Sequence, residues 1–106
     1  MLRMLSDILS IVRMSIKESI NEKSVEYERF VVHLKYMLRR TFEGVCYSEK
    51  QEDLFRLLTK EEQPAYGIAK KIRKYMLEKT DKEIPDEEMS YLMFHLSRIR
   101  KYGLLN

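Results

Sequence analysis

The chain contains two histidines, His33 and His95, and each is flanked by apolar residues at helical spacing. Histidine is the side chain whose unperturbed charge changes near neutral pH, and either ring nitrogen can act as a nucleophile. A polar ring among core residues needs a hydrogen-bond partner or a chemical role. For one histidine taken alone, a core imidazole that donates to a backbone carbonyl is the commoner arrangement. The two residues therefore have to be weighed both as structural and as reactive groups.

The other residues form no recognisable catalytic or metal-binding motif. Two histidines without clustered cysteines or carboxylates at ligand spacing do not predict a closed zinc site. The sequence has no Gly-x-Ser-x-Gly elbow, and its three glycines stand too far apart for a phosphate-binding loop. Cys46 has no basic partner fixed by spacing, and the acidic run Asp86-Glu87-Glu88 fits a helix start better than an acid–base pair. We therefore expect no metal, no cofactor and no enzymatic turnover.

The composition predicts one all-α domain. The chain has 106 residues, of which 44% are hydrophobic and 35% charged, enough apolar material for one core and too much for a disordered chain. Only 3 glycines and 2 prolines are present, so long loops are not expected. Good helix formers such as Lys, Arg, Glu, Leu and Met are plentiful. We expect a compact bundle of about five helices in antiparallel pairs, with residues 1–106 as a single domain.

Charge and cysteine usage favour a cytoplasmic protein. The net charge of +3 is mild, and acidic residues are interleaved with basic ones throughout. The single cysteine excludes an intrachain disulfide, and no signal peptide is visible. No stretch approaches the roughly 20 apolar residues that a membrane-spanning helix needs.

In the N-terminal half, apolar residues recur at spacings of three and four, as in amphipathic helices. This pattern predicts a first helix from Leu2 to Ile20. After a polar break, Ser24 can cap a second helix from about Val25 to Glu43, which Gly44 would end. The residues expected to share one face of the second helix are Phe30, Leu34, Met37, Leu38 and Thr41.

Three further helices are expected in the C-terminal half. A short one runs over about 49–58, with Leu54, Phe55 and Leu58 turned inward. Thr59 and Glu62 occupy the paired positions of a capping box before a clear helix over 65–79. The last helix starts after Pro85, with three carboxylates in its first turn, and ends at Gly103. Its expected apolar side consists of Met89, Leu92, Phe94, Leu96 and Ile99.

Each histidine lies in the interior of a long helix, beside the apolar stripe. His33 follows Phe30 by three residues, and His95 precedes Ile99 by four. Residues three and four apart share a helix face, so both rings should point to the edge of the core. If the second and last helices pack side by side, the two rings could share one surface pocket.

The segments around the histidines resemble the two histidine motifs of PTS-regulation domains. The first is Arg-Phe-Val-Val-His-Leu-Lys over 29–35. The second is Glu-Glu-Met-Ser-Tyr-Leu-Met-Phe-His-Leu-Ser-Arg over 87–98, in which acidic residues lead to Tyr-Leu-x-x-His and a basic residue. The turn over 83–87 and a segment with Tyr66, Ala69, Ile72 and Tyr75 are also similar to the family. The resemblance extends from about Leu2 to Lys101, with the histidine motifs about sixty residues apart.

Such domains occur in bacterial transcriptional antiterminators of sugar-utilisation operons and in related DNA-binding activators. The resemblance implies a five-helix domain in which His33 and His95 correspond to phosphoacceptors of the sugar phosphotransferase system. The implied phosphate donors are the phosphocarrier protein HPr or a sugar-specific permease component. Phosphorylation would alter homodimerisation and thereby control RNA binding by a separate N-terminal domain.

The residue before His33 is valine rather than aspartate. In this respect the chain is more similar to the second of the tandem regulatory domains, which is usually the target of HPr. The RNA-binding domain and a first regulatory copy are absent from the sequence. We therefore expect a fragment of a larger regulator that does not itself bind RNA.

Two arginines are candidate partners for a phosphoryl group. Arg29 precedes His33 by four residues, and Arg98 follows His95 by three, one turn along the same face. Cations near the transferring group stabilise the charge that spreads over its oxygens. A solvated arginine on a helix surface is the commoner explanation for each.

Two other classes of function stay open. A helical nucleic-acid-binding module would use the basic runs 39–40, 70–74 and 98–101, although acidic residues flank each run and favour solvated helix faces. A plain dimerisation domain would use the seven methionines and seven tyrosines for packing alone.

Overall fold

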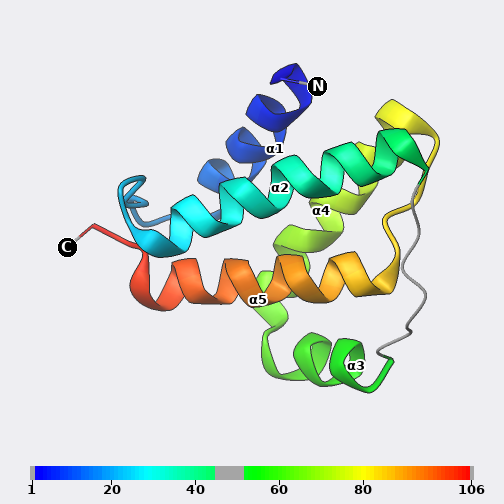
Figure 1. Cartoon of the computed structure of the whole chain (residues 1–106). Coiled ribbons are helices and arrows are strands. Elements are labelled where there is room, and N and C mark those ends of the chain that lie inside the picture. The colour runs from blue at the N-terminus through cyan, green and yellow to red at the C-terminus, as the bar shows by residue number, and fades with distance from the viewer. Residues whose placement is uncertain (1, 45–51, 106) are drawn as a thin grey trace.

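The computed structural model describes residues 2–44 and 52–105, which form five helices (Figure 1). Apart from an isolated bridge between Ile20 and Leu104, these residues contain no β-structure, so the expected all-α bundle is confirmed. Cys46 and the first residues of the short helix predicted over 49–58 lie outside the described residues. The helices are α1 (Leu2–Ser15), α2 (Val25–Glu43), α3 (Glu52–Glu61), α4 (Gln63–Thr80) and α5 (Asp86–Tyr102).

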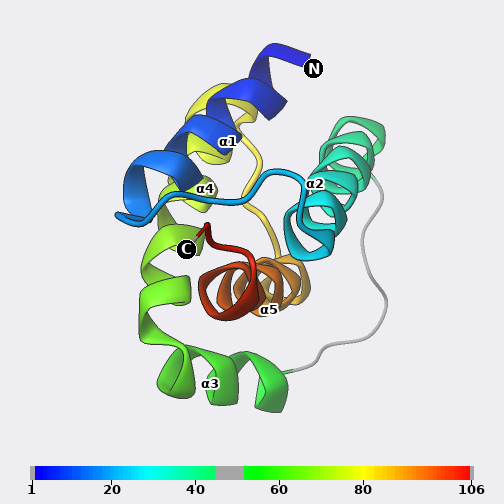
Figure 2. The ribbon, with the colours of Figure 1, turned by 90° about the vertical axis from the view of Figure 1, so that its left-hand side faces the viewer.

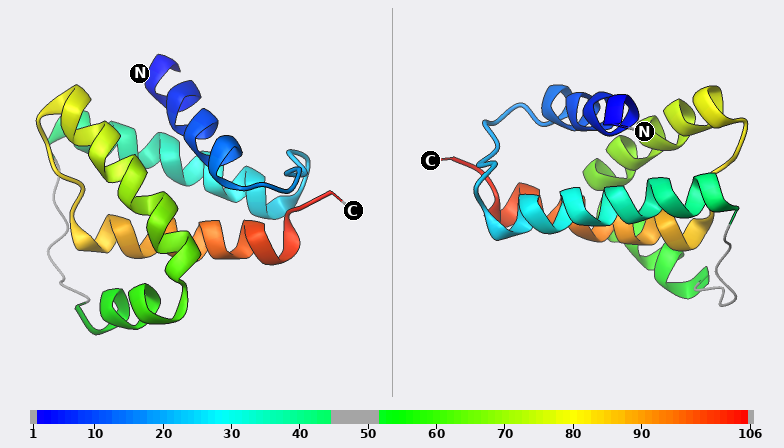
Figure 3. Two further views of the ribbon diagram at one scale, coloured as in Figure 1. Left: turned by 180° about the vertical axis from the view of Figure 1, so that it is seen from behind. Right: turned by 45° about the horizontal axis from the view of Figure 1, so that its top comes forward.

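Helix α5 is the centre of the bundle and packs against α2, α3 and α4. Figure 1 shows α2 and α5 side by side with opposite chain directions, and Figure 2 looks along this pair, with α3 below α5. Seen from behind in Figure 3, α4 crosses the pair obliquely, and α1 packs on α4 and α2. The antiparallel α2–α5 pair is the element that positions both histidines.

Local signals determine the two ends of α2. Oγ of Ser24 accepts a hydrogen bond from the backbone N–H of Tyr27 at 3.2 Å, which satisfies a donor of the first turn. Gly44 ends the helix at φ 71°, a left-handed conformation that costs glycine little. Both caps confirm the sequence prediction. The buried face of α2 consists of Tyr27, Phe30, Leu34, Met37 and Leu38.

Helix α1 is shorter than predicted, because it ends at Ser15 and not at Ile20. The following segment is extended and pairs with the C-terminal end of the chain, where Ile20 bridges Leu104. The backbone N–H of Asn21 donates to the carbonyl of Gly103 at 2.7 Å, and that of residue 105 donates to the carbonyl of residue 19 at 2.8 Å. Near the predicted end of the first helix, these hydrogen bonds to the C-terminal segment take the place of helical backbone hydrogen bonds.

The predicted capping box at Thr59 and Glu62 is wrong. Thr59 lies inside α3, where its hydroxyl donates to the carbonyl of Phe55 at 2.8 Å. Glu62 precedes α4 without a side-chain capping bond and instead accepts from Nζ of Lys101 at 2.9 Å. A long-range ion pair therefore uses the carboxylate that the local pattern assigned to capping.

Two predicted inward residues point outward. Leu54 of α3 is exposed, whereas Phe55 and Leu58 are partly buried against the core. Phe94 of α5 is 49% exposed, because it lies on the side of α5 that α2, α3 and α4 leave open. The other four residues predicted for the apolar side of α5 are fully buried.

The start of α5 is held by Arg73 of α4. The guanidinium of Arg73 donates to the carbonyl of Ile84 at 3.0 and 2.6 Å and to Oδ1 of Asp86 at 2.9 Å. Ile84 itself is buried. These contacts fix where the first turn of α5 begins, and with it the position of Glu88.

Among the described helices, none combines the length and the apolar composition that a membrane-spanning segment requires.

Candidate functional site

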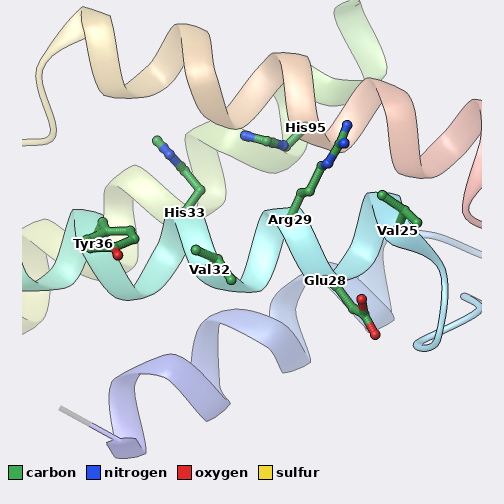
Figure 4. A pocket seen from close by; sticks show the side chains of 7 residues that line it. All are labelled: Val25, Glu28, Arg29, Val32, His33, Tyr36 and His95. Atoms are coloured by element: carbon green, nitrogen blue, oxygen red, sulfur yellow. The ribbon is translucent and has the colours of Figure 1, made fainter.

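The two histidines face each other across the contact between α2 and α5. Their ring centroids are 5.1 Å apart, and the ring planes are inclined by 33°. Both rings border an open groove of about 540 Å³, shown in Figure 4. The expectation that the two rings share one surface pocket is confirmed. The groove is lined by Val25, Glu28, Arg29, Val32, His33, Tyr36 and His95.

His33 is largely enclosed, because its side chain is only 14% exposed. Its Nε2 atom is buried without a hydrogen-bond partner, and it lies 3.5 Å from Oε1 of Glu88. The ring of Tyr91 packs beside it, with a centroid distance of 5.2 Å. Nε2 of His33 therefore faces a carboxylate and not the backbone carbonyl that a structural core histidine commonly uses.

Glu88 is a buried carboxylate at the beginning of α5, only 4% exposed. Nε of Arg40 donates to its Oε2 at 2.8 Å, and Nη2 donates to its Oε1 at 2.9 Å. Burial alone would raise the pKa of Glu88, but the close approach of His33, the hydrogen bonds from Arg40 and the positive charges of both residues lower it overall. The carboxylate is therefore ionised at neutral pH.

The sequence patterns predict neither Arg40 nor Glu88 as a residue of the site. Asp86 and Glu87 fit the predicted acidic helix start, but Glu88 turns inward and belongs to the site. A signal was present, since Arg40 follows His33 by seven residues and Glu88 precedes His95 by seven. Seven residues make two helical turns, so an antiparallel pairing of the two faces brings these four residues together.

His95 has the opposite electrostatic environment. Burial lowers its pKa most, and positive charge on His33, Arg29 and Arg98 lowers it further, to about 4. The ring packs between Phe30 and Phe94, at centroid distances of 6.4 and 5.7 Å. His95 is consequently neutral at pH 7, with a lone pair on one ring nitrogen.

The two arginines predicted as phosphate partners lie at one end of the histidine pair. Figure 4 shows Arg29 reaching from α2 toward α5, beside His95. The guanidinium of Arg98 stacks on Phe94 and Tyr102, with 5.8 and 5.2 Å to the ring centroids. Neither arginine forms an ion pair with a carboxylate among the described residues. Both charges are therefore available to an anion at the histidines.

Four cations of the basic runs pair with carboxylates within the described part of the chain. Arg39 pairs with Glu43, Arg40 with Glu88, and Arg73 with the start of α5. Lys101 pairs with Glu62 across the bundle. These internal partners weigh against the nucleic-acid-binding alternative. In the described part of the chain, no three histidine, cysteine or acidic side chains are grouped to hold a metal ion.

The family match and the similar known proteins point to the same family of domains. Residues 6–99 match the PRD domain family. The transcription antiterminator LicT of Bacillus subtilis is 36% identical over 100 residues, which are 93% of this chain and 36% of that protein. The beta-glucoside operon antiterminator of Dickeya chrysanthemi is 30% identical over 98 residues, 92% of this chain and 35% of that protein. The GlcA/glcB genes antiterminator of Staphylococcus carnosus is 30% identical over 97 residues, 91% and 33% of the two chains. The chain thus spans about a third of the length of these relatives.

Proposed function

This chain belongs to the PRD domain family, and we propose that it is the phosphorylated regulatory domain of a transcription antiterminator that controls sugar-utilisation genes. In this proposal His33 and His95 accept phosphoryl groups from HPr or from a sugar-specific permease component of the phosphotransferase system. Phosphorylation changes self-association of the domain, and this change controls RNA binding by another part of a longer cytoplasmic protein. The domain is regulated and does not itself turn over a substrate.

The observation that carries the proposal is the pairing of His33 and His95 at one groove, with ring centroids 5.1 Å apart. A neutral imidazole nitrogen can attack a phosphorus atom held on a donor histidine, because its lone pair is free. His95 is neutral at pH 7 by virtue of its lowered pKa. Arg29 and Arg98 can stabilise the charge on the transferring oxygens.

The proposed product explains how one modification could alter association. A phosphoryl group adds nearly two negative charges beside apolar residues of α2 and α5. If it were buried unpaired, it would cost several kcal/mol, so arginines must meet it or the helices must repack. A bias of a few kcal/mol shifts a dimer equilibrium about a hundredfold. The α2–α5 groove is therefore the place where phosphorylation would act.

A phosphotransfer assay tests the proposal. The chain is incubated with HPr, its kinase enzyme and phosphoenolpyruvate, and intact mass and sedimentation are then measured. We expect an acid-labile gain of phosphate and a changed self-association constant. His33→Ala and His95→Ala should each lower the phosphate content, and the double variant, which has no histidine, should take up none. Absence of an acid-labile gain, or a gain that the double variant retains, would overturn the proposal.

A further inference from the structure

The two nitrogens of the His33 ring are in different environments. Nε2 is buried and faces Oε1 of Glu88 at 3.5 Å, so a donor protein cannot reach this atom in the structure as it stands. The same ring borders the open groove between α2 and α5. Nδ1 is therefore the nitrogen of His33 that a donor can approach from the groove.

The carboxylate that faces Nε2 is fixed in place from two sides. The planar guanidinium of Arg40 holds both oxygens of Glu88, at 2.8 and 2.9 Å, and a bidentate pair of this kind restricts rotation of the carboxylate. Arg73 holds the backbone before Glu88 through the carbonyl of Ile84 and the carboxylate of Asp86. Glu88 is therefore a preorganised acceptor, whose distance to Nε2 can shorten when the site is engaged.

An ionised carboxylate accepts hydrogen bonds and donates none. A neutral imidazole carries its proton on one nitrogen and its lone pair on the other, so the partner of one nitrogen decides which tautomer is present. With Glu88 in front of Nε2, the favoured tautomer of His33 has the proton on Nε2 and the lone pair on Nδ1. The nitrogen with the lone pair is thus also the one that the groove can expose.

We propose that Glu88, held by Arg40, is a positioning residue that makes Nδ1 the phosphoryl-accepting nitrogen of His33. This inference rests on the proposed function, because it specifies the atom that accepts the group. The Nδ1 lone pair forms a bond to phosphorus while the N–P bond of the donor imidazole breaks, and the electron pair of that bond stays on the donor ring. Nε2 keeps its proton, so the product ring is positively charged. The Glu88 carboxylate stabilises that charge, and no other reagent takes part.

The test uses the full chain with His95→Ala, so that His33 is the only histidine. The ¹⁵N-labelled chain is phosphorylated once with phospho-HPr and once with the small donor phosphoramidate. NMR correlation of phosphorus to the ring nitrogens then identifies the bonded atom. We expect phosphorus on Nδ1 with either donor. Phosphorus on Nε2, or a His33 that neither donor modifies, would overturn the inference.

A second variant separates positioning from a merely structural role. Glu88→Gln in the same background keeps the shape, but its amide can present either an oxygen or an N–H group to Nε2, so the tautomer is no longer fixed. We expect the ring-nitrogen NMR shifts of unphosphorylated His33 to report a mixture of the two neutral tautomers, and about tenfold slower transfer onto Nδ1, the difference between a charged and a neutral hydrogen bond. The matched control Glu87→Gln, on the neighbouring residue, should keep the tautomer and the rate.

Two further outcomes distinguish the positioning role of Glu88 from the proposed phosphate donor. A Glu88→Gln chain that folds, by circular dichroism, and behaves as the Glu87→Gln control in both tautomer and rate would refute the positioning role. Modification on Nδ1 by phosphoramidate but not by phospho-HPr would support the inference and count against the proposed donor, so failure of the one is distinguishable from failure of the other.

Discussion

The imidazoles of His33 and His95 lie with their centroids 5.1 Å apart, although about sixty residues separate them in the sequence. At this distance a charge on one ring is felt by the other, and it contributes to the lowered pKa of His95. The rings nevertheless have different partners, since His33 faces the carboxylate of Glu88 and His95 lies in the field of Arg29 and Arg98. One groove thus presents two histidines of unequal chemistry.

The lowered pKa of His95 predicts a loss of stability in mild acid. The pKa is about 4 in the folded chain against 6.5 for an unperturbed histidine, so between these values the unfolded chain binds more protons. The free energy of unfolding should therefore fall as the pH is lowered from about 6.5 to about 4. Urea unfolding followed by circular dichroism at several pH values measures this. His95→Asn should reduce this fall in the free energy of unfolding. The carboxylates are the same in both chains, so their contribution to the pH dependence cancels in the comparison. Parallel curves for the two chains would contradict the prediction.

The Arg40–Glu88 pair should be costly to break from one side. Glu88→Ala leaves the guanidinium of Arg40 without its carboxylate, and we expect a loss of about 3 kcal/mol of unfolding free energy. The value is at the low end for a buried pair, because the side chain of Arg40 is 24% exposed. The double variant Arg40→Met/Glu88→Leu should recover most of the loss, since it removes both charges together.

A neighbouring ion pair provides the control for that measurement. Arg39 and Glu43 pair at 3.1 Å on the solvent side of the same helix. Arg39→Ala should cost less than about 0.5 kcal/mol in urea unfolding, as exposed pairs do. Equal losses for Glu88→Ala and Arg39→Ala would show that burial of the first pair has no energetic consequence.

The arginines beside His95 should hold down its pKa. Arg29→Gln and Arg98→Gln each remove a positive charge, so the pKa of His95 should rise from about 4 toward its ordinary value of 6.5. Burial is the largest cause of the shift, and the rise should therefore be partial. An NMR titration of the His95 ring measures it, with Lys35→Gln on the exposed side of α2 as the control. An unchanged titration in both arginine variants would exclude them as charges acting on this ring.

Substitutions at a buried and at an exposed residue of α4 should differ in their effect on stability. Ile72 is fully buried, whereas Leu77 is 45% exposed on the same helix. Ile72→Ala should lower the free energy of unfolding by about 3 kcal/mol, through lost burial and the cavity that remains. Leu77→Ala should change it by less than about 0.5 kcal/mol. The two denaturation midpoints should differ accordingly, and similar midpoints would mean that α4 packs in another orientation.

The features that the sequence predicted correctly depend on neighbouring residues. The Ser24 cap, the stop at Gly44 and the buried stripe of α2 follow from hydrogen bonds and side-chain spacing within a few residues. The placement of both histidines beside the apolar stripe has the same origin. These local rules also predicted the number of helices and the all-α class, because each amphipathic segment needs a partner that covers its apolar face.

The features that it predicted incorrectly depend on distant partners. Ile20 continues the apolar period of α1, yet its segment pairs with Leu104, and Glu62 bonds Lys101 instead of capping α4. Phe94 fits the apolar pattern but is 49% exposed, on a side of α5 that the described helices leave open. In each case the packing of segments far apart in the chain, which the local pattern does not contain, decides the outcome.

By itself, the sequence determined the number of helices, the two ends of α2 and the presence of two histidines on apolar faces, because spacing and capping act over one or two turns. Only the tertiary structure decided how α2 and α5 are rotated against each other. That rotation brings the two rings within 5.1 Å and turns Glu88 inward onto Arg40 and His33. Burying a charged carboxylate costs free energy, which is compensated only where a cation lies within bonding distance. The position of Arg40 therefore determines which of the three acids at the start of α5 can enter the core.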